Sequence, residues 1–403
     1  MNPLHVPPDN DAITGQHRDS FAWDTLRVIL EGTSPLELPA MAVATREDAH
    51  AFLRHYGFDL NDADDLRDAW QIHDDAVRFI RTYLVSAHGS TSGLTLPESA
   101  VAPADLGDLL VQASSPDRDD TARWACAVLR VMHTINHANR AFHNENLAQI
   151  RQQVLEPYRQ CLQVDELGCP LLQRGAQRVP LEGVFLKEDK TRDSIILKLL
   201  HKPSNVAQDI YDWIGVQFVT RTPLEALLVV RFLRQNHLVT FANIVPGRSI
   251  NNLVDLSRFR DAYESLSHDE ADLPEEVEHL LADGRQFGKS DTAFHVNPFS
   301  GSEYRSIQFT CRQLIRIAHP ARKPLENMMR ALREHTGGDA VAPLLEKMNR
   351  IPIPKEMSFF FPYEIQILDY ENYLKTRVGE SSHAAYKKRQ LLAARRRVLQ
   401  GLI

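Results

Sequence analysis

Two carboxylates in the second half of the chain stand in segments that favour metal-assisted chemistry. Asp212 opens the segment DWIGVQFV, and Glu364 lies within YEIQIL. Both segments have the β-branched and aromatic content of strands, and we expect them in one sheet. Two carboxylates on neighbouring strands can converge on Mg²⁺, which prefers oxygen ligands. The pair therefore predicts a shared magnesium site.

Cationic and hydroxyl side chains gather shortly before Asp212, in LKEDKTRDSIILK. Lys190, Ser194 and Lys198 are spaced by four residues, so they share one face if this segment is helical. Such a face opposite a carboxylate–magnesium pair is suited to a triphosphate. Arg248, in the turn PGR, adds another cation. The alternative is a solvated helix face, with Asp212 serving only as a turn or capping residue.

Two further strand-like segments carry polar residues of particular kinds. In YEIQILDY, alternation places Ile365 and Ile367 on one face and Glu364 and Gln366 on the other. The segment EYRSIQFT, residues 303–310, similarly combines apolar positions with Tyr304, Arg305, Ser306 and Gln308. A half-buried strand does not require such residues for folding, so these side chains are candidates for ligand binding.

The elements that must position these residues fall into two regions. Residues 1–20 are rich in Pro, Asp and Asn and are predicted to be a flexible tail. Residues 21–167 have helical apolar spacing, including one long pattern from Asp119 to about Leu162, and predict an all-helical domain of unknown role. From 168 to 403, strand and helix patterns alternate. That order predicts an α/β or α+β domain around one mixed sheet.

In this second region the strands are expected at 181–187, 210–220, 238–245, 306–317 and 358–368, and helices at 194–202 and 223–238. The second of these helices has a proline at its start, which is a favourable first helical position. Helical insertions are expected near 254–284 and 323–349.

Composition limits the class of protein. The chain has 403 residues, a formal net charge of −7, 43% hydrophobic and 25% charged residues, which is typical of a soluble globular protein. The negative charge argues against general coating of nucleic acid, and we expect no DNA partner. Four cysteines without CxxC pairing favour a reduced, cytoplasmic protein. We expect no signal peptide and no membrane partner, since no apolar run approaches about 20 residues.

Six short motifs also occur in an order that resembles the RelA/SpoT-type alarmone synthetases. They are KTRDSIILK, DWIGVQFV, PGR, EYRSIQ, EIQI and HAAYK, and the resemblance covers about residues 181–390. The positions that match the family's motifs are Lys190, Ser194, Lys198, Asp212, Pro246, Gly247, Arg248, Tyr304, Arg305, Ser306, Glu364, Gln366, His383, Tyr386 and Lys387.

The resemblance implies a nucleotidyltransferase-like mixed sheet with flanking helices and a magnesium-dependent pyrophosphokinase. Pyrophosphate would move from ATP to the 3′-hydroxyl of a nucleotide, as in alarmone synthesis. Asp212 would hold Mg²⁺ on the ATP phosphates, while Glu364 would help bind the metal and activate the hydroxyl. Tyr304 would stack on the acceptor base, guanine in the family, which explains an aromatic ring on a polar strand face. The other nucleotide-binding candidates are Lys190, Ser194, Lys198, Arg248, Arg305, Gln308, Gln366 and Lys387.

The chain departs from the family pattern mainly on the phosphate-binding side. The family's arginine two residues before Lys190 is Glu188, its strand arginine is Gln217, and its strand histidine is Gln308. Either the donor or acceptor has changed, or catalysis has weakened. Two alternatives therefore remain: a nucleotide-binding or interaction module, and toxin-like pyrophosphorylation of tRNA 3′ ends. The basic segment YKKRQLLAARRRVL favours the second, although such a run is also typical of a solvated helix.

Some family members carry a hydrolase domain with a His…His-Asp…Asp metal site. Here His73-Asp74 is a lone pair, and His133, His137 and His143 follow one helical pattern. We therefore predict surface or packing histidines rather than a hydrolase centre.

Overall fold

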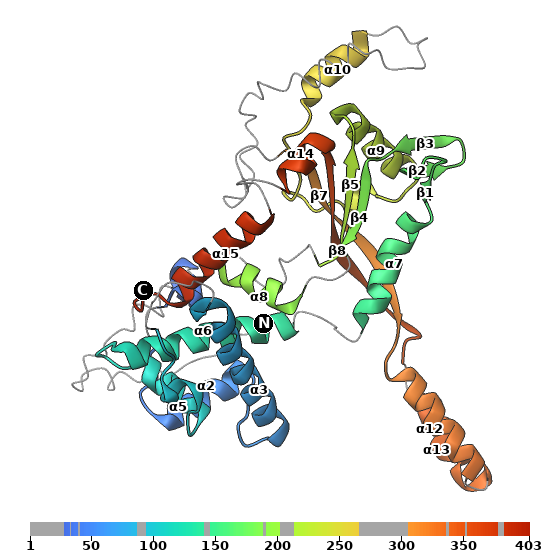
Figure 1. Ribbon diagram of the computed structural model, residues 1–403. Helices are drawn as coiled ribbons and strands as arrows, with labels where there is room; N and C mark the ends of the chain where they lie inside the picture. Colours follow the sequence, from blue (N-terminus) through green and yellow to red (C-terminus); the bar gives the residue numbers. More distant parts are fainter. Residues whose placement is uncertain are drawn as a thin grey trace, which may run out of the picture. The chain divides into compact units, whose positions relative to one another are not determined.

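The computed structural model describes residues 28–32, 34–38, 41–86, 94–140, 146–187, 191–201, 213–265, 305–335, 338–350, 353–377 and 383–403 (Figure 1). The chain forms two compact units. Unit 1 comprises Met1–His133 and Arg395–Ile403, and unit 2 comprises Thr134–Ala394. The boundary at 133/134 falls within helix α6 (Asp120–Arg140), and the boundary at 394/395 falls within helix α15 (His383–Val398). The first of these boundaries, at 133/134, lies N-terminal to the boundary at 167/168 that the sequence patterns predict.

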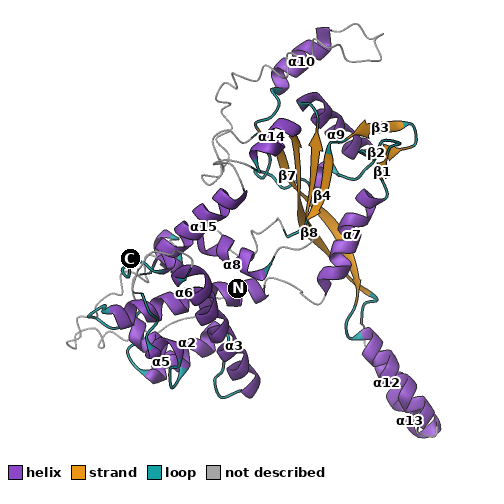
Figure 2. Ribbon diagram, viewed as in Figure 1, coloured by secondary structure: helices purple, strands orange, loops and turns teal. Residues whose placement is uncertain are grey.

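Unit 1 is built from helices over its described residues (Figure 2). Their bounds are η1 (Pro35–Glu37), α2 (Arg46–Tyr56), α3 (Ala63–Phe79), the π-helix η2 (Ile80–Val85), α4 (Glu98–Val101) and α5 (Leu106–Ala113), followed by α6. Thr45 and Asp48 form a capping box at the start of α2. The side chain of Asp62 accepts hydrogen bonds from two backbone N–H groups at the start of α3. These caps satisfy N–H groups that have no partner within the helix.

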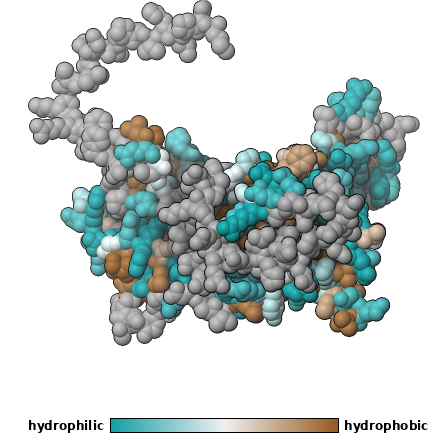
Figure 3. Space-filling view, turned by 90° about the horizontal axis from the view of Figure 1, so that it is seen from above, coloured by the Kyte–Doolittle hydropathy of each residue, from teal (hydrophilic) through white to brown (hydrophobic). Residues whose placement is uncertain are grey.

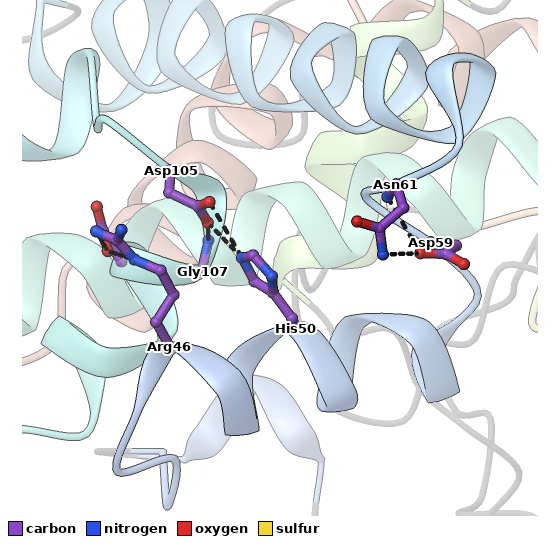
Figure 4. A network of polar contacts seen from close by, with 7 residues as sticks. Arg46, His50, Asp59, Asn61, Asp105 and Gly107 are labelled. Atoms are coloured by element: carbon purple, nitrogen blue, oxygen red, sulfur yellow. Dashed lines mark hydrogen bonds and ion pairs between the residues drawn. The ribbon is translucent and has the colours of Figure 1, made fainter.

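A polar network joins α2 to α5 (Figure 4). His50 Nε2 lies 2.9 Å from Asp105 Oδ1, which also accepts a hydrogen bond from the Gly107 backbone N–H at 2.7 Å. Arg46 donates to Asp108 at 2.6 Å. A Cβ at Gly107 would lie 3.0–3.2 Å from Asp105, His50 and Ala49 side-chain atoms, so a larger residue would push these neighbours apart by a few tenths of an ångström.

The main sheet of unit 2 has five strands in the order β4-β5-β8-β7-β6. They are β4 (Gly183–Lys187), β5 (Gly215–Thr220), β6 (Ile250–Asn251), β7 (Ile307–Ala318) and β8 (Glu356–Asp369). β5 and β8 are parallel, and the other neighbours are antiparallel. The prediction of a mixed α/β chain is therefore confirmed at this level.

Helices α7 (Leu147–Arg159) and α9 (Pro223–Gln235) pack on one face of this sheet (Figure 1). That face is apolar because alternate strand residues, such as Val216, Phe218, Ile365 and Ile367, are buried there. Further helices among the described residues of unit 2 are α8 (Arg192–His201), α10 (Leu256–Ser265), α12 (Arg322–His335), α13 (Gly338–Asn349) and α14 (Tyr370–Lys375), besides most of α15. α10 follows β6, and α12 and α13 lie between β7 and β8.

A second, three-stranded antiparallel sheet contains β1 (Leu162–Val164), β2 (Pro170–Arg174) and β3 (Gln177–Pro180). The helical pattern expected to about Leu162 ends at Arg159 in α7, and the prediction of an all-helical region to residue 167 is wrong here because Leu162–Val164 form β1. Gly168 and Gly175 have positive φ angles of 84° and 58° and permit the two tight turns that pair these short strands. Leu172 and Val179 lie in register and are buried.

The expected strand at 238–245 is also wrong. Residues Phe241–Asn243 form the 3-10 helix η5, and Ile244 makes only an isolated bridge to Cys311. Local turn hydrogen bonds explain this outcome, since Asn243 N–H donates to the Thr240 carbonyl at 2.9 Å. Phe241 is exposed, so strand-like alternation is not realised.

The described surface is mainly hydrophilic in the view of Figure 3, with hydrophobic residues in separate patches. Over the described ranges, no helix has the length and apolar character needed to cross a bilayer.

Candidate functional site

The second face of the five-stranded sheet is polar at its centre. Strand register places two rows of residues across it: Lys187–Gly215–Glu364–Thr310 and Phe185–Gln217–Gln366–Gln308. Paired residues in a sheet project to the same side, so these side chains share one face. Glu364 and Gln366 thus lie together, as alternation in their segment predicts.

The carboxylate of Glu364 is held from the neighbouring strand. Gln308 Nε2 donates to Glu364 Oε2 at 2.5 Å. Gly215, directly opposite Glu364 on β5, has no side chain, and the stem of the Lys187 side chain lies over it: Lys187 Cδ is 3.5 Å from the position that a Cβ would take. Both Glu364 and Gln308 are half-buried.

Three strands meet at the Gln366 side chain. Its Oε1 accepts a hydrogen bond from Gln217 Nε2 at 2.6 Å and another from Lys187 Nζ at 3.2 Å. Gln366 is a binding residue predicted from sequence, whereas Gln217 stands out in the sequence only as a departure from the family pattern. Period-2 alternation within GVQFVT is the signal that places Gln217 on this face.

An aromatic and cationic cluster borders the polar face. Phe185 stacks on Tyr373 of α14, with ring centroids 5.5 Å apart and an interplanar angle of 17°. The guanidinium of Arg377 lies 5.0 Å from the Tyr373 ring centroid and 5.9 Å from that of Phe185. These distances are typical of cation–π contact. Sequence reasoning missed this cluster because α14 and β4 are far apart in the chain.

Arg305 lies just before β7, close to α14. Lys375 hydrogen-bonds to Glu371 at 2.7 Å and is the main cause of a lowered Glu371 pKa. The positive charge of Arg305 acts in the same direction, which places Arg305 within electrostatic range of Glu371. Arg248 lies in a turn closed by its own N–H donating to the Val245 carbonyl at 3.2 Å. That turn leads to Ile250, which lies opposite Gln308.

The predicted helix at 194–202 is present as α8. Ser194 and Lys198 are half-buried on it, while Ile195 and Leu199 are buried. The Thr191 hydroxyl, just before α8 begins, accepts a hydrogen bond from the Ser194 N–H of its first turn at 3.3 Å. Four peptide units separate Lys187 from Thr191, so the start of α8 lies within about 15 Å of the end of β4.

Three predicted site residues lie outside the described residues: Lys190, Asp212 and Tyr304. Their proposed roles remain predictions from sequence. Lys387 is exposed on α15, and that helix contacts α8 through Gln390 and His201, whose side-chain nitrogens are 3.3 Å apart.

The histidines considered for a hydrolase centre have other contacts. The His73 side chain is completely buried, and its Nε2 lies 3.0 Å from the Ala100 carbonyl oxygen. His133 Nδ1 lies 2.8 Å from the hydroxyl of Tyr56. His143 is outside the described residues. Within the described ranges, no three His, Cys, Asp or Glu side chains cluster in a way suited to a metal ion.

The chain matches no protein-family model, no curated protein and no solved structure. The residues of the site themselves indicate its chemical character. It combines one oriented carboxylate, three amide side chains and a lysine on the polar face of a sheet, with aromatic and arginine side chains at its border. Such groups can bind a hydrated cation, phosphate oxygens and a flat ring.

Proposed function

We propose that the polar face of the five-stranded sheet is a nucleotide site that transfers pyrophosphate from ATP to a 3′-hydroxyl, with Mg²⁺ bound by Asp212 and Glu364. The observation that carries this proposal is the placement of Glu364. Its carboxylate is oriented by Gln308, lies opposite a glycine, and shares its face with Gln366 and Lys187. The ordered motifs of an alarmone synthetase add support from sequence.

In the proposed reaction, the acceptor's 3′-oxygen forms a bond to the β-phosphorus of ATP. The bond between that phosphorus and the α–β bridging oxygen breaks, and AMP leaves with its electrons. The hydroxyl proton passes to Glu364. Lys187, Ser194 and Lys198 would hold phosphate oxygens, so catalysis relies on positioning and charge neutralisation.

The test is incubation of the full chain with labelled ATP, Mg²⁺ and separate acceptors: GDP, GTP, ADP and tRNA. Mass analysis of the products is expected to show an acceptor that has gained a pyrophosphate, together with an equal amount of AMP. Glu364→Gln should abolish both products. Turnover of ATP to ADP and phosphate alone, or equal activity in Glu364→Gln, would contradict the proposal.

A second candidate is a binding module without catalysis. The observation that favours it is the amide network itself, because Gln217 and Gln308 stand where the family has an arginine and a histidine. Loss of those cations reduces stabilisation of transferring phosphates. This candidate predicts magnesium-dependent nucleotide binding without any transferred pyrophosphate.

A further inference from the structure

The two central strands continue beyond the rest of the sheet as a two-stranded ribbon (Figure 1). β7 and β8 pair without interruption from Ile307↔Ile367 to Ala318↔Glu356, whereas β5 pairs with β8 only from Glu364 onward. The ribbon therefore has two faces of its own.

One ribbon face is packed. Ile315, Ile317 and Phe361 are buried, and α7 lies against β7. Gln153 of α7 donates to the Arg316 carbonyl at 2.7 Å and accepts from the Arg316 N–H at 3.1 Å. These bonds satisfy backbone groups along the outer edge of β7, which would otherwise be open to pairing. Helix α7 thereby covers this face and contacts the edge of the ribbon.

The opposite ribbon face is exposed and has an unusual composition. We define it as Arg312, Leu314, Arg316, Ser358, Phe360 and Pro362; the exposed Glu356, opposite Ala318, lies at the far end of the same face. Leu314 and Phe360 are direct cross-strand partners, and they are 40% and 56% exposed. The exposed Arg312 and Arg316 flank Leu314 at two residues on either side. The face therefore presents an aromatic and an aliphatic side chain between two cations.

This ribbon face is continuous with the candidate site. Residues 358, 360, 362, 364 and 366 alternate along β8 and therefore project to one side. Phe360 is four residues from Glu364, a separation of about 13 Å along a strand. A partner lying along the ribbon face would extend toward the Glu364 carboxylate.

We propose that the ribbon face binds single-stranded nucleic acid, whose end it directs toward the Glu364 site. Arginine is suited to phosphate, and an exposed aromatic ring is suited to stacking on any base. The direction toward Glu364 rests on the proposed function, whereas binding along the ribbon does not. The net charge of −7 is compatible with this arrangement because Arg312 and Arg316 act locally, and the carboxylate of Glu356 at the far end of the face offsets only one of them.

Other partners fit this face less well. A stable dimer buries about 800 Å² on each subunit, far more than one Leu–Phe pair supplies. Binding to an anionic membrane gains about 1 kcal/mol for each cation near the surface, and this face has only Arg312 and Arg316.

The test is fluorescence anisotropy of a labelled single-stranded RNA of about 10 nucleotides, within the usual range for such sites. The full chain is compared with the double variant Arg312→Ala/Arg316→Ala over a series of salt concentrations. Loss of two phosphate contacts should reduce the slope of log K against log salt by about 1.4. Arg178→Ala, an exposed arginine of β3, is the matched control and should leave the slope unchanged.

Phe360 tests the stacking contribution. Phe360→Ala should weaken RNA binding by about 5- to 150-fold, while Phe360→Tyr keeps the ring and should bind as the unchanged chain does. Since Phe360 is more than half exposed, both variants should retain the thermal unfolding midpoint. A duplex of the same sequence should bind more weakly, because its bases are already stacked.

Two measurements separate this inference from the proposed function. Magnesium–ATP titration should be unaffected by the ribbon variants, whatever the RNA result. Absence of RNA binding by the unchanged chain, or equal losses in Arg178→Ala and the double variant, would overturn the ribbon proposal alone. Phe360-dependent binding to phosphatidylserine vesicles without RNA binding, or Phe360-dependent dimerisation in sedimentation, would also overturn it.

Discussion

Gln308 donates a 2.5 Å hydrogen bond to Glu364 across the β7–β8 pair, although the two residues are not direct partners. Gln308 lies opposite Gln366, and Glu364 lies opposite Thr310. The bond is therefore diagonal and restricts the carboxylate to one side of its strand. This arrangement makes separate predictions for the two residues.

Glu364→Gln keeps the shape of the side chain and removes its charge. A neutral amide is a poor ligand for Mg²⁺ compared with a carboxylate, so magnesium-dependent ATP affinity should fall at least tenfold. Calorimetric titration with and without Mg²⁺ measures the change. Glu182→Gln, the same substitution at an exposed residue beside β4, should leave it unaltered. Equal affinities for Glu364→Gln and Glu182→Gln would remove Glu364 from the metal site.

Gln308 is predicted to be a positioning residue. Gln308→Ala removes a hydrogen bond to a charged group, worth about 1.5–3 kcal/mol, and should lower kcat by about 10- to 150-fold with a smaller change in KM. Gln308→His can still donate from a ring nitrogen and should recover part of the rate. If kcat is unchanged in Gln308→Ala, orientation of Glu364 by this bond is unimportant for turnover.

Tyr304 is predicted from sequence to be the stacking platform for the acceptor base. Tyr304→Ala should weaken acceptor binding by about 5- to 150-fold, because base–aromatic stacking contributes about 1–3 kcal/mol. Tyr304→Phe retains the ring and should lose little. Acceptor titration in the presence of Mg²⁺ compares the two variants. Equal losses would indicate a role for the hydroxyl, and no loss in either would exclude Tyr304 from the site.

A buried tyrosine pair joins α7 to the sheet that carries the site. The hydroxyl oxygens of Tyr158 and Tyr363 are 2.9 Å apart, and each lies 3.3 Å from the Leu238 carbonyl oxygen. Burial raises the pKa of both phenols, so both stay neutral at physiological pH. Tyr158→Phe should lower the free energy of unfolding by about 1 kcal/mol. Denaturant titration measures this, with the half-buried Tyr83→Phe in unit 1 as a comparison.

The contact between His50 and Asp105 predicts a pH dependence for unit 1. Burial raises the pKa of Asp105, but hydrogen bonds from His50 and Gly107 and the charges of His50 and Arg46 lower it by more, so the net shift is downward. A lowered carboxyl pKa stabilises the fold above the ordinary aspartate value of about 3.9, and this contribution is lost as pH falls through the lowered value.

Asp105→Asn retains the cap of α5, since asparagine and aspartate cap helices equally well, but removes the charge. The difference in unfolding midpoint between the unchanged chain and Asp105→Asn should therefore be larger above about pH 4 than below it. Thermal unfolding followed by circular dichroism at several pH values measures it. A difference that grows on acidification would contradict the assigned direction. Asp117→Asn, at an exposed loop residue, is the control.

Local sequence pattern determined much of the second unit. Alternation in YEIQIL correctly places Glu364 and Gln366 on one face, opposite the buried Ile365 and Ile367. Thr222, Pro223 and Glu225 mark the start of α9 through a capping box and a proline in the first turn. These features depend on residues a few positions apart, and such interactions are expressed wherever the segment lies.

Tertiary structure decided which of these segments meet. Gln308 and Glu364 are 56 residues apart, and Lys187 reaches Gln366 across 179 residues. Arg397, part of the basic run that suggested RNA binding, is instead ion-paired with Glu37 at 2.5 Å and its side chain is almost fully buried. Strand order, register and such distant pairs arise from burial of one shared apolar face. A single segment's pattern specifies that it has such a face, but not which other segment will cover it.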